Sequence, residues 1–352
     1  MKIMHILWGL RYGGAETMSV DIINRQCLEH EVELLIVNRD IDYDLLLQIN
    51  PQVRIYTINR PLKSKNPFYI LKLNFLLLFS NADIIHSQMD NIIKFFPSYF
   101  LKKNFCLTVH SVRLGYQGIN KYTRVFAITD EVRESIWKHA GIKAQVVYNG
   151  VDIRKFNTKK SNASLNIFRI VQIGRLDHLN KGQHLSLKAI HSLVTQYNYT
   201  NIHLDVIGEG DSENYLKELS SQLIINEYVT FCGAQTKDYI RENLSNYDLL
   251  VQPSLWEGFG LTITEAMSAR VPTLISNVDG MKTTSFNGMY SYTFQSGNAE
   301  DYAEQLYRII QLPATEREAL AEKAYKYACD HFDISITVEN YLKQYKQIIS
   351  KK

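Results

Sequence analysis

The chain has 352 residues, which is long for one hydrophobic core and suits two domains. Its apolar content of 45% and charged content of 21% are those of a globular protein and exclude a disordered or fibrous chain. Its four cysteines form no Cys-x-x-Cys or His/Cys cluster, so no zinc site is indicated and a reduced compartment is expected. No apolar run approaches the roughly 18 residues of a membrane span, and no signal-peptide pattern is visible. The expected location is therefore cytoplasmic.

Buried-strand patterns alternate with helical patterns through the first half of the chain. Such alternation predicts a parallel, doubly wound α/β sheet. The strand patterns cover residues 3–8, 32–37, 53–58, 83–87, 105–109, 124–128 and 145–148. Gly13 and Gly14 follow the first of them and precede a helical pattern at 15–27. This turn is neither Gly-x-Gly-x-x-Gly nor a Walker loop, which argues against a nicotinamide dehydrogenase and a P-loop protein.

Two groups of polar residues in this half are candidates for chemistry. Asp40, Asp42 and Asp44 could hold a metal-bound diphosphate, but they open a Leu-rich helical stretch where acidic residues are ordinary, so no metal site is expected. His86 and His110 end predicted strands, where doubly wound sheets gather their ligands. His110 is the stronger active-site candidate of the two, since a strand-end histidine such as His86 is more often structural.

The chain has a formal net charge of +3, and its excess of basic residues is concentrated in one segment. Residues 60–105 hold seven basic residues against two acidic ones, interleaved with aromatic residues. Such a segment is typical of nucleic-acid binding, of an anionic membrane surface, or of helices with buried aromatics and solvated lysines. No nucleic-acid motif accompanies it, so nucleic acid is not expected as a partner. A peripheral contact with the inner face of the cell membrane remains as one hypothesis.

The alternation restarts after a polar stretch at residues 157–166. The strand patterns of the second half cover 168–173, 202–207, 229–232 and 247–252, and three helical patterns follow from about residue 299. We predict an N-terminal Rossmann-like domain at 1–155, a second one at 165–333, and a final helix at 334–352. After the first of these strands come Gly174 and two cations, Arg175 and Lys181, which suit a diphosphate leaving group.

The most informative stretch runs from Asp248 to Ser276. An apolar strand breaks at Pro253, passes through a loop with Gly258 and Gly260, and leads into a helical pattern at 261–269. The amides at such a helix start suit a phosphate. Glu257 and Glu265 bracket the turn in a Glu-x7-Glu spacing, and carboxylates accept hydrogen bonds from vicinal hydroxyls. Phosphate donors flanked by hydroxyl acceptors predict a nucleotide-sugar site.

This stretch resembles the hallmark of the retaining glycosyltransferases with two Rossmann-like domains facing across a cleft (the GT-B fold), family 4 group. Gly13 and Gly14, the Asn149–Asp152 turn, and the Gly-Arg-Leu…Lys-Gly element at 174–182 also match that family. The resemblance weakens after Ser276, where residues 278–283 replace the usual Gly-Gly…Glu segment. The family implies that the second domain binds the donor, that the first binds the acceptor, and that the last helix returns to the first domain.

The resemblance also implies roles for the candidate residues. His110, Glu257, Arg175 and Lys181 would be catalytic, and no metal or other cofactor would be needed. The donor, a nucleoside-diphosphate sugar with UDP favoured, would contact Gly13, Gly14, Gly174, Gly208, Gly233, Phe259, Gly260, Leu261 and Glu265. The acceptor would be a glycan or lipid-linked sugar in surface polysaccharide or glycolipid assembly. A UDP-sugar epimerase or hydrolase of the same fold and a non-catalytic nucleotide-sugar-binding protein are the alternatives.

Overall fold

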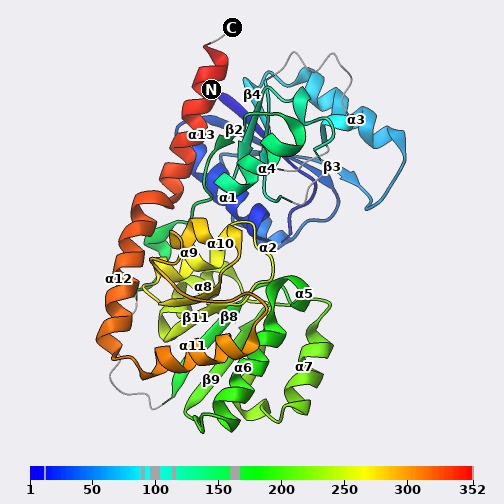
Figure 1. Cartoon of the computed structure of the whole chain (residues 1–352). Helices are drawn as coiled ribbons and strands as arrows, with labels where there is room; N and C mark the ends of the chain where they lie inside the picture. Colours follow the sequence, from blue (N-terminus) through cyan, green and yellow to red (C-terminus); the bar gives the residue numbers. More distant parts are fainter. Residues whose placement is uncertain (12, 89–91, 96–103, 113–115, 159–166, 351–352) are drawn as a thin grey trace. The chain divides into compact units, whose positions relative to one another are not determined.

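The computed structural model describes residues 1–11, 13–88, 92–95, 104–112, 116–158 and 167–350. The chain folds into two compact units (Figure 1). Unit 1 combines Met1–Val151 with Ile334–Lys352, and unit 2 is Asp152–Asp333. The following members of the basic and aromatic segment at 60–105 lie outside the described residues: Asp90, Phe96, Tyr99, Phe100, Lys102 and Lys103.

Unit 1 is built on a seven-stranded parallel sheet with the strand order β3-β2-β1-β4-β5-β6-β7. Strand β1 lies in register with both of its neighbours, so that Ile3 pairs with Val32 on one side and with Ile84 on the other. Strands such as β1, β2 and β5 are almost fully buried, as expected inside a sheet that is covered on both faces, whereas the edge strand β3 is partly exposed. They are β1 (Lys2–Leu7), β2 (Glu31–Asn38), β3 (Arg54–Arg60), β4 (Ile84–Ser87), β5 (Phe105–Val109), β6 (Arg124–Ala127) and β7 (Gln145–Val146).

The helices of unit 1 begin and end at recognisable local signals. Asn66 accepts a hydrogen bond from the Phe68 amide at the start of α3, and Asp42 accepts one from the Leu45 amide at the start of α2. Asp42 is thus a helix cap, and Asp40 forms an ion pair with Arg11. The helices are α1 (Gly14–Gln26), α2 (Tyr43–Leu47), α3 (Pro67–Phe79), α4 (Asp130–Ala140) and α13 (Ile334–Ile349).

Helix α13 is the C-terminal part of unit 1 and is anchored by a buried polar network. The Tyr345 hydroxyl lies 2.5 Å from His86 Nδ1, and the Tyr341 hydroxyl lies 2.9 Å from Thr108 Oγ1. Thr108 Oγ1 is also 2.9 Å from His86 Nε2, which joins the two tyrosines through strands β4 and β5. All four side chains are buried. His86 therefore supports the fold, in line with its weaker candidacy as a site residue.

The buried histidines make the stability of unit 1 depend on pH. Burial lowers the pKa of His5 to about 4 and lowers that of His86 well below its usual value, the latter aided by the neighbouring His5 and His110. Below about pH 6.5 these histidines bind protons in the unfolded chain, whereas their rings stay neutral in the folded state. We expect the free energy of unfolding to fall as the pH drops from about 6.5 towards 4, measured by urea unfolding. A flat profile of the free energy of unfolding between these pH values would contradict the prediction.

Unit 2 contains a second parallel sheet, of six strands in the order β10-β9-β8-β11-β12-β13. Four of its strands match the predicted patterns. The other two, β12 and β13, have four and three residues and are not among the predicted strand patterns. The strands are β8 (Phe168–Ile173), β9 (Ile202–Ile207), β10 (Val229–Gly233), β11 (Leu249–Gln252), β12 (Thr273–Ser276) and β13 (Tyr292–Phe294).

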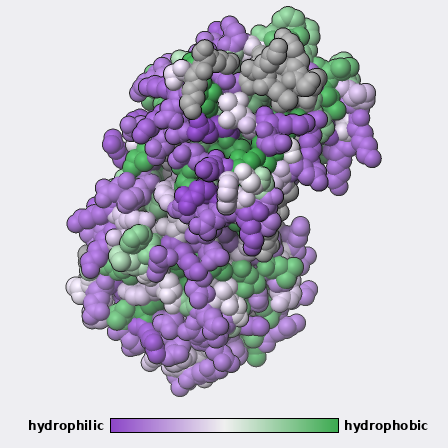
Figure 2. All heavy atoms as spheres, turned by 45° about the horizontal axis from the view of Figure 1, so that its top comes forward, coloured by the Kyte–Doolittle hydropathy of each residue, from purple (hydrophilic) through white to green (hydrophobic). Residues whose placement is uncertain are grey.

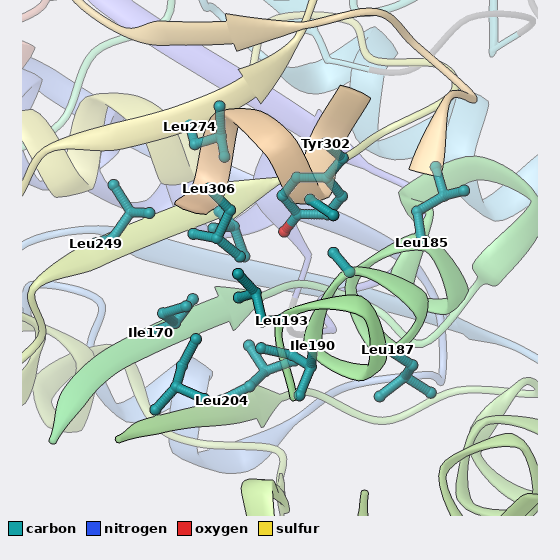
Figure 3. Close-up of a cluster of buried hydrophobic side chains, with 14 of the residues drawn as sticks. Ile170, Leu185, Leu187, Ile190, Leu193, Leu204, Leu249, Leu274, Tyr302 and Leu306 are labelled. Atoms are coloured by element: carbon teal, nitrogen blue, oxygen red, sulfur yellow. The ribbon is translucent and has the colours of Figure 1, made fainter. Parts of the chain in front are cut away.

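The core of unit 2 lies between this sheet and helices α6 and α11. In Figure 3, Ile170, Leu204 and Leu249 point from the strands towards Leu193 and Leu306 of the helices. This packing fixes where each strand ends and hence where the following loops begin. The helices are α5 (His178–Lys181), α6 (Gln183–Thr195), α7 (Glu213–Gln222), α8 (Lys237–Asn243), α9 (Leu261–Ser268), α10 (Asp279–Ser285), α11 (Ala299–Gln311) and α12 (Ala314–His331).

The two parallel α/β units confirm the predicted fold class. They arise because short apolar strands, each followed by an amphipathic helix, bury their side chains best as a parallel sheet covered by helices. Among the described residues, none of the helices combines the length and the apolar character that crossing a bilayer requires.

Candidate functional site

The topology of unit 2 brings two loops to one place. The strand order reverses between the neighbouring strands β8 and β11, and ligands of doubly wound sheets bind at the carboxyl ends of such a pair. The loop segment after β8, residues 174–182, includes the one-turn helix α5, and the loop after β11 holds residues 253–260. The carbonyl oxygen of Asn180 accepts hydrogen bonds from the amides of Leu255 and Trp256, at 2.8 and 3.3 Å, which fixes the two loops against each other.

An ion pair between Lys181 and Glu257 stands at this junction. The Nζ atom of Lys181 lies 2.7 Å from Glu257 Oε2, and the two side chains are 27% and 13% exposed. The hydroxyl of Ser254 and the amide of Gly258 also donate to this carboxylate, at 3.4 and 3.2 Å. A half-buried pair held by extra hydrogen bonds has a defined geometry. The ammonium group is thus positioned before any anion arrives.

Buried hydrogen bonds hold the backbone of Lys181 in place. Gln172 in β8 donates from Nε2 to the Lys181 carbonyl oxygen at 3.1 Å and accepts from the Ser186 hydroxyl at 2.7 Å. Ser186 lies in α6 and is also 3.0 Å from the Tyr302 hydroxyl of α11. Gln172 and Ser186 are not among the predicted site residues, because a single polar residue inside an apolar run gives no signal of its partner.

Arg175 lies on the same loop but is held much less firmly. Its side chain is 74% exposed, and its guanidinium lies 3.2 Å from a carboxylate oxygen of Asp177. A hydrogen bond from Asn180, together with the nearby Arg175 charge, lowers the pKa of Asp177, so this carboxylate stays ionised. An exposed pair of this kind contributes little stability and exchanges partners readily. Arg175 can therefore turn to a bound anion.

Three predicted glycines form the floor of the site at the carboxyl ends of adjacent strands. The Gly208 amide donates to the Gly233 carbonyl at 2.8 Å, and the Gly174 amide donates to the Ile207 carbonyl at 2.9 Å. A Cβ atom on Gly208 would lie 2.0 Å from the Gly174 carbonyl oxygen. A Cβ atom on Gly174 or Gly233 would meet nothing within 4 Å, but both residues have positive φ, +154° and +66°, which glycine adopts most easily.

Helix α9 begins at the edge of the same site. Gly260 adopts the left-handed conformation, with φ of +82°, and Leu261 is the first helical residue. The Phe259 ring is buried and packs edge-on against Phe332 at 5.4 Å. Phe259 could therefore contact a ligand only through its backbone, whereas the partly exposed Glu265 lies further along α9. The helix start offers first-turn amides and the positive dipole end that an anion prefers.

Gly280 is a site residue for which the sequence carries no clear signal. It lies in the segment that replaces the Gly-Gly…Glu element of the resembled family. A Cβ atom at this position would lie 2.0 Å from the carbonyl oxygen of Glu257 and 2.9 Å from the carbonyl carbon of Gly258. Helix α10 thus packs directly against the backbone of the Glu257 loop, and glycine allows this approach.

The remaining candidates belong to unit 1. Gly13 and Gly14 follow β1, and His110 follows β5 at the same edge of the sheet. His110 Nε2 lies 3.1 Å from Gln88 Oε1, and desolvation lowers the pKa of His110 to about 4, so its ring is neutral at pH 7. Gln88, which follows β4, is a further residue that the sequence patterns do not indicate.

The polar groups of the site in unit 2 are the cations Lys181 and Arg175, backbone amides, and the carboxylates of Glu257 and Glu265. Across the described ranges, no three His, Cys, Asp or Glu side chains come together in a way that could hold a metal ion. The arrangement in unit 2 can neutralise a dianion with Lys181 and Arg175 and can accept hydroxyl hydrogen bonds at Glu257 and Glu265.

Two family models match this chain. The model described as "Glycosyl transferases group 1" matches residues 153–327, and the model described as "Glycosyltransferase Family 4" matches residues 12–155. Their boundary falls within a few residues of the division between units 1 and 2, at Val151 and Asp152. The first model covers every candidate residue of unit 2, and the second covers Gly13, Gly14 and His110.

Individual proteins show the same similarity. MJ1607 of Methanocaldococcus jannaschii, a glycosyltransferase, is 24% identical in an alignment of 310 residues that covers 75% of this chain and 77% of that protein. An Escherichia coli enzyme named UDP-Gal:alpha-D-GlcNAc-diphosphoundecaprenol alpha-1,3-galactosyltransferase is 24% identical in an alignment of 217 residues that covers 56% of this chain and 55% of that enzyme. Anabaena HepE, solved with UDP and glucose, matches with a TM-score of 0.83 at 21% identity over 99% of this chain and 100% of HepE.

Proposed function

Because the chain belongs to the group 1 glycosyltransferases and has the GT-B fold, we propose that it transfers a hexose with retention from a nucleoside-diphosphate sugar to a hydroxyl acceptor. The observation that carries the proposal is the Lys181–Glu257 pair beside Arg175 and the start of α9. Uridine diphosphate is the proposed nucleotide, in keeping with the UDP bound to HepE. The E. coli galactosyltransferase matches this chain over only about half of its own length, so the substrate is part of the proposal.

The proposed reaction breaks one bond and forms one bond at the anomeric carbon. The bond from this carbon to the diphosphate oxygen breaks, and the diphosphate leaves with the electron pair. The acceptor oxygen bonds to the same carbon and releases its proton, which the leaving phosphate oxygen can take. Negative charge therefore grows on the diphosphate, and fixed cations stabilise the transition state more than the ground state.

Each residue of the unit 2 site has a part in this scheme. Lys181 and Arg175 neutralise the diphosphate, and the amides of Phe259, Gly260 and Leu261 donate to its oxygens. Glu257 holds the sugar hydroxyls, and Glu265 accepts from the ribose. With two protein cations and a helix start available, the scheme needs no metal ion.

Unit 1 is the proposed acceptor unit. His110, neutral at pH 7, can donate or accept a hydrogen bond without adding charge, which suits contact with a sugar hydroxyl. The name of the E. coli relative specifies a sugar carried on diphosphoundecaprenol as its acceptor. We extend that acceptor class to this chain: a glycan or lipid-linked sugar in surface polysaccharide assembly, met at the inner face of the cell membrane.

The donor assignment predicts a specific thermal stabilisation. One nucleotide class among UDP-, GDP-, ADP- and dTDP-sugars should raise the temperature at which the chain unfolds. At a ligand concentration of a hundred times Kd, binding adds about 2.7 kcal/mol to the free energy of unfolding. Glu265→Ala should remove most of this shift and raise the transfer barrier by about 2–4 kcal/mol, since the ribose hydroxyls lose their charged acceptor. Glu218→Ala, an exposed glutamate on α7, is the matched control. Equal stabilisation by all four classes, or full activity of Glu265→Ala, would refute the assignment.

Product analysis separates the two alternative functions. Transfer yields a glycosylated acceptor, whereas an epimerase or hydrolase of the same fold yields free or inverted sugar without any acceptor. A non-catalytic nucleotide-sugar-binding protein would show the thermal shift and no product. The positioned cations at the diphosphate favour bond cleavage, and hence an enzyme, over binding alone.

A further inference from the structure

Helix α3 of unit 1 carries apolar side chains on its outer face. Five large apolar residues are between 42% and 69% exposed: Phe68, Leu71, Phe75, Leu78 and Phe79. In Figure 2, hydrophobic atoms reach the surface at the upper right, where α3 lies in Figure 1. A contiguous apolar face of this kind is uncommon on soluble proteins and marks an interaction surface.

The five side chains form one stripe. At about 100° per residue, they fall within an arc of roughly 100° on the helix. Leu73 and Leu77, on the opposite side, are buried against the sheet. The helix is therefore anchored by its inner face, and its outer stripe has no partner among the described residues. Asn66 and Pro67 define its start, so no folding step is needed before the stripe can bind.

The charge around the stripe has one sign. From Arg60 to Phe79 the chain has four basic residues and no acidic one. Lys63 and Lys65 are exposed in the loop before the helix. Lys72 lies beside the stripe, with Nζ 3.3 Å from the Thr57 carbonyl oxygen. Glu33 lines a hollow beside Phe79 but is paired with Lys2 at 2.9 Å. The lysines of the helix and of its preceding loop therefore add positive charge beside the apolar side chains, which complements a surface that is apolar inside and anionic outside.

We propose that α3 and the loop before it form a membrane-docking surface that binds anionic bilayers. The helix has 13 residues, about 20 Å at 1.5 Å per residue, which is shorter than a hydrocarbon core. It therefore lies in the plane of the interface, with the stripe in the acyl region and Lys63 and Lys65 at the lipid phosphates. Two copies of the chain docked stripe to stripe would bring their lysines together, so like charges disfavour self-association.

Vesicle flotation tests this docking surface without donor or acceptor, so its outcome is independent of the proposed transfer reaction. The full chain is expected to float with phosphatidylcholine vesicles that contain phosphatidylglycerol and to be released by high salt. The double variant Phe68→Ser/Phe75→Ser should lower the partition coefficient by at least about tenfold, because two phenyl groups no longer enter the acyl region. Lys63→Glu/Lys65→Glu should abolish the preference for phosphatidylglycerol.

Two controls make the result specific. Leu47→Ser removes an apolar side chain that is 82% exposed on α2 of the same unit, and Lys323→Glu reverses an exposed charge of unit 2. Both should bind vesicles as the native chain does. The changed side chains are exposed, so the unfolding midpoint should stay the same. Native-like flotation of the Phe variant, or equal binding to vesicles with and without phosphatidylglycerol, would overturn the proposal. If the native chain formed a dimer and did not bind vesicles, and if the Phe variant lost that dimer, the stripe would instead be an interface with a second copy of the chain.

Discussion

Lys181→Ala is expected to lower kcat/KM for sugar transfer by about 100- to 1,000-fold, the usual effect of losing one positioned electrostatic donor. The ammonium group is prepositioned by Glu257 at 2.7 Å and by the backbone contact from Gln172. A diphosphate that leaves carries more negative charge than the carboxylate, so the ammonium interaction strengthens as the bond breaks. Steady-state kinetics measures the loss, with the unfolding midpoint as a check on folding.

The chain offers a matched control for this substitution. Lys217 and Glu213 form another lysine–glutamate pair in unit 2, at 2.6 Å, but their side chains are 52% and 35% exposed. Lys217→Ala removes an equally short ion pair and should leave transfer unchanged, since an exposed helix pair contributes only about 0.3–0.5 kcal/mol. If Lys181→Ala retained native turnover, or if Lys217→Ala lost as much, the role assigned to Lys181 would be wrong.

Gly182→Ala is expected to reduce both the stability of unit 2 and the rate of transfer. Gly182 has φ of +66°, and a Cβ atom would lie 2.0 Å from the carbonyl oxygen of Pro253. Either the loop that carries Lys181 or the loop that carries Glu257 must then move. We expect a loss of about 1–3 kcal/mol of stability from the overlap and a further loss of about 1 kcal/mol from the left-handed backbone. Transfer should fall by at least about tenfold, since misplaced catalytic groups are costly.

Gly141→Ala separates the two causes. Gly141 ends α4 with φ of +66° and ψ of 19°, nearly the values of Gly182, but nothing lies within 4 Å of its Cβ position. It should lose only the backbone contribution and leave transfer unaffected. Urea unfolding and kinetics of both variants measure the difference. Similar behaviour of the two would show that the Pro253 contact is unimportant.

Much of the fold could be predicted because it depends on local patterns. Strands such as Phe105–Val109 and Phe168–Ile173 are continuous apolar runs with clear ends, and the structure places both as expected. Strand β13, with three residues of mixed burial, could not be found in this way. Its position is decided by pairing with β12, which is a contact between distant parts of the chain. The path of α13 likewise depends on Tyr341 and Tyr345 reaching side chains of strands β4 and β5.

The site divides in the same way. Lys181 and Glu257 could be proposed because each lies in a glycine-marked loop with a recognisable spacing. Gln172 and Gly280 could not, because their parts depend on contacts with Lys181 and Glu257 that no local pattern contains. Phe259 illustrates a finer limit: the motif marks the residue, but only packing shows that its ring faces Phe332 and leaves the backbone for a ligand.

The sequence by itself determined the two α/β units and the chemistry of the Asp248–Ser276 stretch. Apolar periodicity and turn residues act within a few positions of each other, so they can be read without a structure. Only the tertiary structure decided that the loops after β8 and β11 meet, that Lys181 pairs with Glu257, and that the apolar stripe of α3 faces outward. Each of these depends on strand order or on side-chain burial, which arise when distant segments pack together.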